Sequence, residues 1–149
     1  MSRIVRRLLA ACSVALALSG CAESLPGAPT GTVDAYSVTI GDCTGPISSG
    51  VADRLELIDC AAEHNWEAFA ATKLDPEKYP GNPALTRTAG EYCEAAFADF
   101  VGAKINKSKY DLTFLLPTDD TWAAGDREVV CLAGSASKQL TGSLEGIGK

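Results

Sequence analysis

The chain has 149 residues, and its 13 Lys plus Arg against 19 Asp plus Glu give a formal net charge of −6 at pH 7. This length provides room for one domain. The acidic balance argues against nucleic acid as a partner, and against electrostatic docking on anionic lipid head groups.

The first twenty residues have the layout of a secretory signal peptide. Three arginines, at positions 3, 6 and 7, precede an apolar run over residues 8–18, which is shorter than the roughly 20 apolar residues that a membrane span needs. The next segment, Leu18-Ser19-Gly20-Cys21, resembles the lipobox of bacterial lipoproteins. We therefore expect cleavage after Gly20 and lipidation of Cys21. Its diacylglycerol and palmitate chains would anchor the protein on the extracytoplasmic side of the cell membrane.

Two other interpretations of this terminus stay open. Cys21 could follow an ordinary secretory signal by chance, and Arg6-Arg7 could mark twin-arginine export, although the residues after this pair favour the general secretory route. Either route exports the chain. Removal of the signal leaves 10 Lys plus Arg against 19 Asp plus Glu, a formal charge of −9. The acyl chains, rather than the protein surface, would then hold the membrane.

We expect the signal over residues 1–20, a flexible tether over 21–34 and the folded domain over 35–149. The tether is rich in Pro, Gly, Ser and Thr and lacks apolar periodicity. Alternating apolar and polar residues predict a half-buried strand over 54–60. The other segments before the main helix are expected as a strand over 35–40, a turn at 41–42 that presents Cys43, a loop over 47–53, a connector over 61–64, and a strand over 66–72 whose alanines also allow a helix.

The clearest element is a helix that begins after a turn signal at Tyr79-Pro80-Gly81. Asn82 is expected as its N-cap, Pro83 as its first residue and Gly102 as its C-terminal cap. Apolar residues at three- and four-residue spacing form one stripe along the helix. They are Leu85, Ala89, Tyr92, Cys93, Ala96, Phe97 and Phe100.

After the helix, strands are expected over 112–116, where Pro117 ends the strand, and over 129–132. A loop over 118–125 carries Trp122, and residues 138–144 are a weaker last strand. These elements predict an α+β fold, in which a small antiparallel sheet is packed by one main helix.

The cysteines of the mature domain predict two disulfides that pin this fold; they are Cys43, Cys60, Cys93 and Cys131. An even number of cysteines is typical of an exported domain, while the lack of a Cys-x-x-Cys pair argues against zinc. Four cysteines allow three pairings. We favour Cys43 with Cys60 and Cys93 with Cys131, because the buried helix stripe places Cys93 above the sheet.

Seven short motifs follow one another along the chain: Gly41-Asp42-Cys43, Cys60-x-x-x-His64-x-x-Glu67, Tyr79-Pro80-Gly81, Cys93 in the helix, Trp122-x-x-Gly125-Asp126-Arg127, Val130-Cys131-Leu132 and Thr141-Gly142-Ser143-Leu144. Their order and spacing, over about residues 38–146, resemble the septum-formation domain family of actinobacterial extracytoplasmic proteins. The resemblance implies work in cell division or the envelope, with no catalytic activity, ligand or mechanism to carry over. Ala68 departs from the family pattern, in which a β-branched residue follows the glutamate.

His64 is the only histidine and is flanked by Glu63 and Glu67, which makes it a weak candidate for a pH-sensitive or metal-binding group. A structural role is favoured, because a zinc site or general base normally needs more converging partners than one imidazole supplies. We therefore expect no metal site and no cofactor.

Trp122, Asp126 and Arg127 form a candidate binding patch, because tryptophan and arginine are frequent anchors at protein interfaces. The preferred interpretation is structural. Asp126 and Arg127 would pair in a turn, and Trp122 would cover the edge of the core.

We expect the chain not to be an enzyme. It has no Gly-x-Ser-x-Gly elbow in the mature part, and a small domain with one helix offers little cleft for paired carboxylates. The sequence favours a non-catalytic binding or structural module whose partner is an unknown envelope protein. The alternatives are a solute- or metal-binding lipoprotein that passes its ligand to a membrane partner, and a simple spacer.

Overall fold

The computed structural model describes residues 29–47, 53–75 and 77–148. The predicted signal peptide, the predicted lipid site Cys21 and the tether up to residue 28 lie outside the described residues. The elements follow the chain in the order β1 (Gly31–Asp34), η1 (Ala35–Ser37), β2 (Cys43–Thr44), β3 (Arg54–Ile58), β4 (Trp66–Lys73), α1 (Asn82–Val101), η2 (Ile105–Lys107), β5 (Asp111–Leu115), α2 (Asp119–Ala123) and β6 (Glu128–Gly134).

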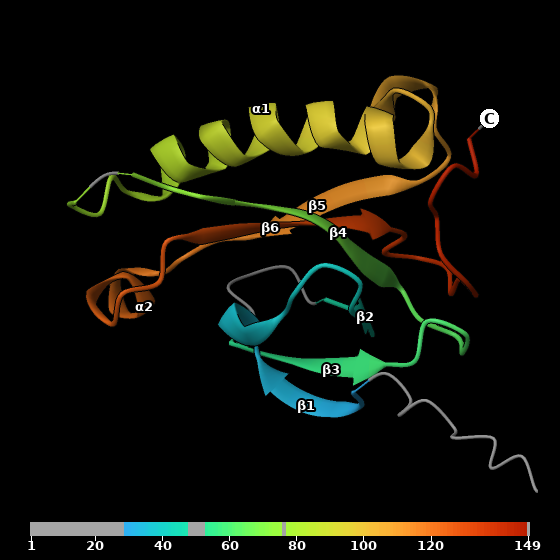
Figure 1. Ribbon diagram of the computed structural model, residues 1–149, viewed down its shortest axis with the longest axis horizontal. Helices are drawn as coiled ribbons and strands as arrows, with labels where there is room; N and C mark the ends of the chain where they lie inside the picture. Colours follow the sequence, from blue (N-terminus) through green and yellow to red (C-terminus); the bar gives the residue numbers. More distant parts are fainter. Residues whose placement is uncertain (1–28, 48–52, 76, 149) are drawn as a thin grey trace, which may run out of the picture.

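Six strands form one antiparallel sheet in the order β1-β3-β2-β4-β6-β5. The sheet is curled, so that α1 lies along β4, β5 and β6 on one side while β1 and β3 lie on the other side (Figure 1). The predicted α+β fold with one main helix is confirmed. Because the sheet does not close, β1 and β5 are left as its two edges.

Two apolar cores lie on opposite faces of β4 and β6. Alternation along β4 directs Trp66 and Ala68 into the core inside the curl, and Phe69 into the core beneath α1. A β-bulge between Ala68 and Ala70 shifts the register against β6. Each large side chain that is buried contributes about 1.5–3 kcal/mol. The core beneath α1 contains Phe69, Ala89, Cys93, Phe97, Val101, Val129, Cys131, Ala133 and Leu144, and the core inside the curl contains Val38, Leu55, Leu57, Trp66, Ala68, Val130 and Leu132.

The main helix begins one residue earlier than expected, because Gly81 rather than Asn82 occupies the N-cap position. Its end at Gly102 is confirmed, where the left-handed conformation (φ 84°) lets the N–H donate to the Ala98 carbonyl. Most of the predicted stripe is buried. Tyr92 differs: it lies at the rim, 37% exposed, and its hydroxyl donates to the Ala71 carbonyl at 2.8 Å.

Both predicted disulfides are present. Cys93 on α1 is bonded to Cys131 on β6 and joins the helix to the sheet. Cys43 on β2 is bonded to Cys60, which follows β3. The two bonds therefore fix the two halves of the domain separately, one on each side of the curled sheet.

Several local expectations are wrong. The strand expected over 35–40 is replaced by η1, and the strand comes earlier, over the last residues of the predicted tether, where pairing with β3 overrides their weak apolar pattern. The loop expected over 118–125 contains α2, which a Thr118–Thr121 capping box stabilises. The last strand expected over 138–144 is reduced to an isolated bridge between His64 and Leu140. Residues 66–72 lie in strand β4, so their helical alternative is excluded.

Candidate functional site

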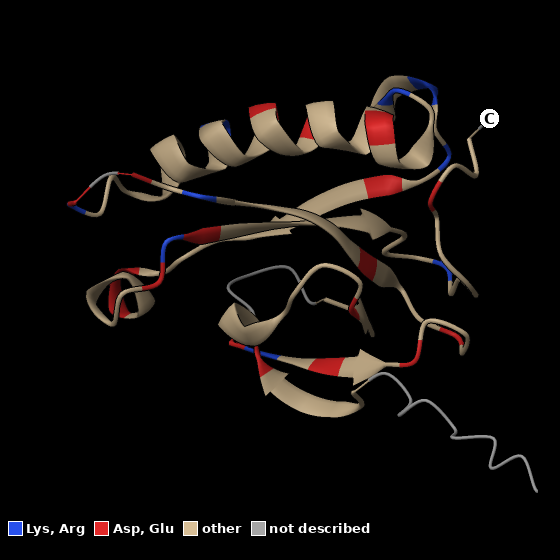
Figure 2. Cartoon of the chain, viewed as in Figure 1, with Lys and Arg blue, Asp and Glu red and all other residues tan. Residues whose placement is uncertain are grey.

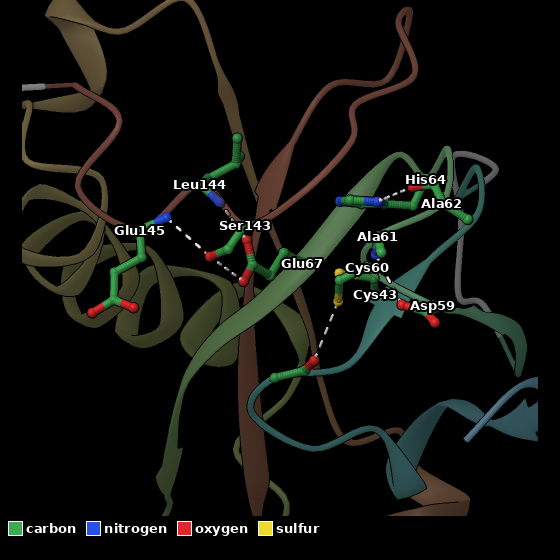
Figure 3. The surroundings of a disulfide bond; sticks show 11 residues. Cys43, Asp59, Cys60, Ala61, Ala62, His64, Glu67, Ser143, Leu144 and Glu145 are labelled. Atoms are coloured by element: carbon green, nitrogen blue, oxygen red, sulfur yellow. Dashed lines mark hydrogen bonds between the residues drawn. A yellow bond between two sulfur atoms is a disulfide. The ribbon is translucent and has the colours of Figure 1, made fainter. Parts of the chain in front are cut away.

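The His64 corner is a structural joint. His64 is fully buried, and its backbone exchanges hydrogen bonds with Leu140 at 3.0 and 2.7 Å. Its imidazole Nδ1 lies 3.0 Å from the Ala62 carbonyl, and within the described ranges neither Glu63 nor Glu67 bonds the ring. Figure 3 shows this ring beside the Cys43–Cys60 disulfide.

Glu67 holds the C-terminal segment against the sheet. Only 6% of this residue is exposed, and its two carboxylate oxygens accept from the Ser143 hydroxyl and the Leu144 N–H, each at 2.7 Å (Figure 3). Gly142 also donates to the Cys60 carbonyl at 2.7 Å. Two of the sequence motifs, Cys60-x-x-x-His64-x-x-Glu67 and Thr141-Gly142-Ser143-Leu144, therefore meet in space. The hydrogen bonds between these two motifs attach the C-terminal segment to the sheet.

The structure shows no cluster of three or more His, Cys, Asp or Glu that could hold a metal ion within residues 29–47, 53–75 and 77–148. His64 is fully buried, and its Nε2 has no hydrogen-bond partner among the described residues. The residue is placed to support the corner rather than to present an open ligand position.

Trp122, Asp126 and Arg127 are brought together, but as an internal cluster. The Arg127 guanidinium lies 3.9 Å from the Trp122 ring centroid, and its Nη1 donates to the Trp122 and Asp126 carbonyls at 2.8 and 2.7 Å. Tyr79 packs edge-on against the same ring. Trp122 is only 5% exposed, so its aromatic face is already covered by the protein.

A groove that the sequence did not reveal lies between the two edges of the curled sheet. Its volume is about 530 Å³, which is within the range of ligand-binding clefts. One wall is formed by residues 113–118 of β5 and the turn after it, and the other by residues 34–36 at the end of β1. Trp66 and Val130, both buried, form its floor. The open sheet provides most of this space, and Asn82 and Thr86 at the start of α1 also line it.

Among the described residues that line the groove, the side chains charged at pH 7 are all carboxylates. They are Asp34, Asp53, Asp126 and Glu128. Asp34 makes an exposed ion pair with Arg54 at 3.5 Å and accepts from the Tyr36 hydroxyl at 3.3 Å, while Asp126 accepts from the Glu128 N–H at 3.0 Å. Figure 2 shows several basic residues on the connection between α1 and β5, and single basic residues on β3 beside β1 and between α2 and β6. The groove is therefore an acidic surface.

No local pattern marks this groove in the sequence. Its lining comes from β1, from the start of α1, from β5 and from the turn before β6, which lie far apart along the chain. One feature of the sequence is compatible with the groove. Pro117 ends the strand expected over 112–116, and proline is typical of edge strands, but the order of the strands in the sheet does not follow from it.

Comparison with known proteins shows the family to which this chain belongs. A family model described as septum formation matches residues 40–145. The chain belongs to the septum-formation family. Proteins named "Putative lipoprotein LppN" in Mycobacterium tuberculosis and Mycobacterium bovis are each 26% identical to it over 113 residues, which is 72% of this chain and 62% of each relative. This chain thus covers less than two thirds of the length of these curated relatives.

No solved structure matches the chain. Across the described ranges, none of the helices is both long and apolar enough to pass through a bilayer. The seven motifs that resemble the family, from Gly41 to Leu144, all lie within the matched region. The family assignment by resemblance is therefore confirmed.

Proposed function

We propose that this protein is a lipid-anchored extracytoplasmic lipoprotein whose septum-formation domain acts as a non-catalytic binding module of the cell envelope, linked to septum formation. Its anchor would be the acylated Cys21. Its partner would be another envelope protein that docks on the folded domain. The family supplies the link to septation only through its name.

Three observations support the location. The segment before Cys21 matches a lipobox, the similar mycobacterial proteins are named as lipoproteins, and the four cysteines of the domain form two disulfides. Disulfides persist in oxidising compartments outside the cytoplasm. All three observations agree with export.

The acidic groove carries the proposal of binding. It is the place where apolar floor, polar walls and an unpaired strand edge converge, whereas the Trp122 cluster is already packed internally. Its described lining residues include neither histidine nor cysteine, which supports a binding role over nucleophilic or imidazole chemistry.

This proposal can be tested by expressing the full chain in an actinobacterial host. We expect metabolic labelling with an alkyne analogue of palmitate to mark the wild type, which stays with membranes, and Cys21→Ser to remove both label and attachment. A photoreactive residue at Tyr36, in the groove, should crosslink to an envelope protein in dividing cells. The same residue at Tyr92, at the rim of α1, is the matched control. An unlabelled wild type, or equal crosslinking at both positions, would contradict the proposal.

A further inference from the structure

We infer that the groove binds an extended, lysine- or arginine-containing segment of a partner protein, which adds as a further strand to the free edge of β5. This inference rests on the proposed function, because it names the chemistry of the partner that the binding module takes. It concerns the face between β5 and the end of β1 rather than the Trp122 cluster.

The groove borders the edge of β5 rather than one face of the strand. Residues 113–116 all line it, although successive side chains of a strand point to opposite faces. Phe114 and Leu116 pack against the core beneath α1, whereas Leu115 packs against the core inside the curl. A space in contact with both sets must run along the edge between them.

This edge has backbone groups free for pairing. Within the described ranges β5 is bonded to β6 alone. In an antiparallel ladder, alternate residues direct their N–H and C=O groups away from the neighbouring strand. An extended peptide can pair with such an edge by adding one more strand, and its side chains then decide specificity.

The charges of the groove select a basic partner. Four carboxylates, and no Lys, Arg or His, are found among the described residues that line it. Asp53 and Glu128 make no side-chain hydrogen bond or ion pair with other described residues, so they are free to meet a cation. A cationic segment would gain attraction from both walls, while an acidic one would be repelled.

Apolar and aromatic groups lie between these carboxylates. Trp66 and Val130 form the floor, and Tyr36 is 61% exposed at the mouth. The buried Trp66 Nε1 has no hydrogen-bond partner among the described residues. These groups fit a segment that alternates apolar and basic side chains, and a small diamine would leave most of them uncovered. A second copy of this chain is disfavoured by its net charge of −6.

The test uses the full-length lipidated protein in nanodiscs of neutral lipid. The probe is a short fluorescent peptide that alternates valine and lysine, and its binding is followed by anisotropy. We expect saturable binding that weakens with added salt. The double variant Asp53→Asn/Glu128→Gln should weaken the affinity by about tenfold. The matched control is Glu91→Gln/Asp99→Asn, which makes the same charge change at exposed positions of α1 and should bind like the wild type.

Three further probes distinguish a basic peptide that pairs as a strand from other possible ligands of the groove. A peptide with glutamate in place of lysine should not bind, and backbone N-methylation of the valine–lysine peptide should abolish its binding because the methyl groups block strand pairing. Equal binding of either peptide, or competition by cadaverine at the same concentration, would overturn the inference. So would a concentration-dependent dimer that the groove variant dissolves. If the peptide fails while the Tyr36 crosslink and the lipid label are retained, the inference falls and the proposed function stands.

Discussion

The Glu67 carboxylate accepts the Ser143 hydroxyl at 2.7 Å, across a sequence separation of 76 residues. The second oxygen accepts the Leu144 N–H, and Leu144 itself lies in the core beneath α1. The charged side chain is almost fully buried, so its hydrogen bonds to these two donors replace the hydrogen bonds to water that burial removes. This contact explains why a glutamate is tolerated in the buried part of strand β4.

Loss of this carboxylate should destabilise the whole domain. We expect Glu67→Ala to lower the free energy of unfolding by about 2–3 kcal/mol, because it removes two charge-assisted hydrogen bonds and leaves a buried N–H unpaired. Glu67→Gln can still accept from Leu144 and should cost only about 1 kcal/mol. Urea denaturation gives both values. Glu145→Gln, at an exposed position, is the control, and a Glu67→Ala variant as stable as this control would refute the role of the contact.

The two disulfides should differ in both reactivity and stabilisation. Cys93 and Cys131 are completely buried, whereas Cys60 is partly exposed, so mild reductant should open Cys43–Cys60 first. In the chain-entropy description, separations of 38 and 17 residues correspond to about 4 and about 3 kcal/mol. Differential alkylation followed by mass spectrometry gives the order of reduction. Earlier reduction of Cys93–Cys131 would show that α1 opens before the rest of the domain.

The Arg127 guanidinium should be irreplaceable by an ammonium group. Arg127→Lys keeps the charge but loses the planar stacking on Trp122 and the geometry of two carbonyl contacts. We expect it to reduce stability by about 1–2 kcal/mol. Arg87→Lys, at an exposed position of α1, controls for the change of residue type and should be neutral. Equal stability of the two variants in urea would mean that the cluster with Trp122 contributes little.

His64 should contribute to the stability of the fold and should not bind a metal ion. Its burial and its contact with the Ala62 carbonyl predict that His64→Ala unfolds at a lower temperature than the wild type, because a fully enclosed side chain leaves a cavity. Calorimetric titration with Zn²⁺ should give no stoichiometric binding to either protein. Zinc binding by the wild type that His64→Ala loses would reverse this assignment.

Sequence reasoning succeeded where one local pattern decides the structure. The spacing of Cys93 with Phe97 predicted the buried face of α1, and an apolar stripe of this kind needs no knowledge of the rest of the fold. It failed for short elements. The loop expected over 118–125 contains α2, although both residues of its Thr118–Thr121 capping box are visible in the sequence. β1 comes earlier than the expected strand, because pairing with β3 rather than its own residues holds it.

The groove could not be predicted from sequence for a physical reason. The decision that β1 and β5 are the two edges depends on the order of all six strands, and non-local pairing of strands leaves no fixed spacing in the chain. Asp126 was chosen from the sequence as part of a patch with Trp122 and Arg127. The structure instead separates their roles, because Asp126 lines the groove while Trp122 is buried beside it.

Hydrogen–deuterium exchange on the full-length protein, with and without the valine–lysine peptide, tests the groove most directly. We expect the peptide to slow amide exchange over residues 111–117, which comprise β5 and the turn after it, and over residues 34–37 on the facing wall, because strand addition gives free N–H groups a bonding partner. Exchange of α1 and of the connection at 104–109 should be unchanged. Protection confined to those segments or to the Trp122 cluster, or no protection at all, would contradict the assignment of the groove as the binding surface.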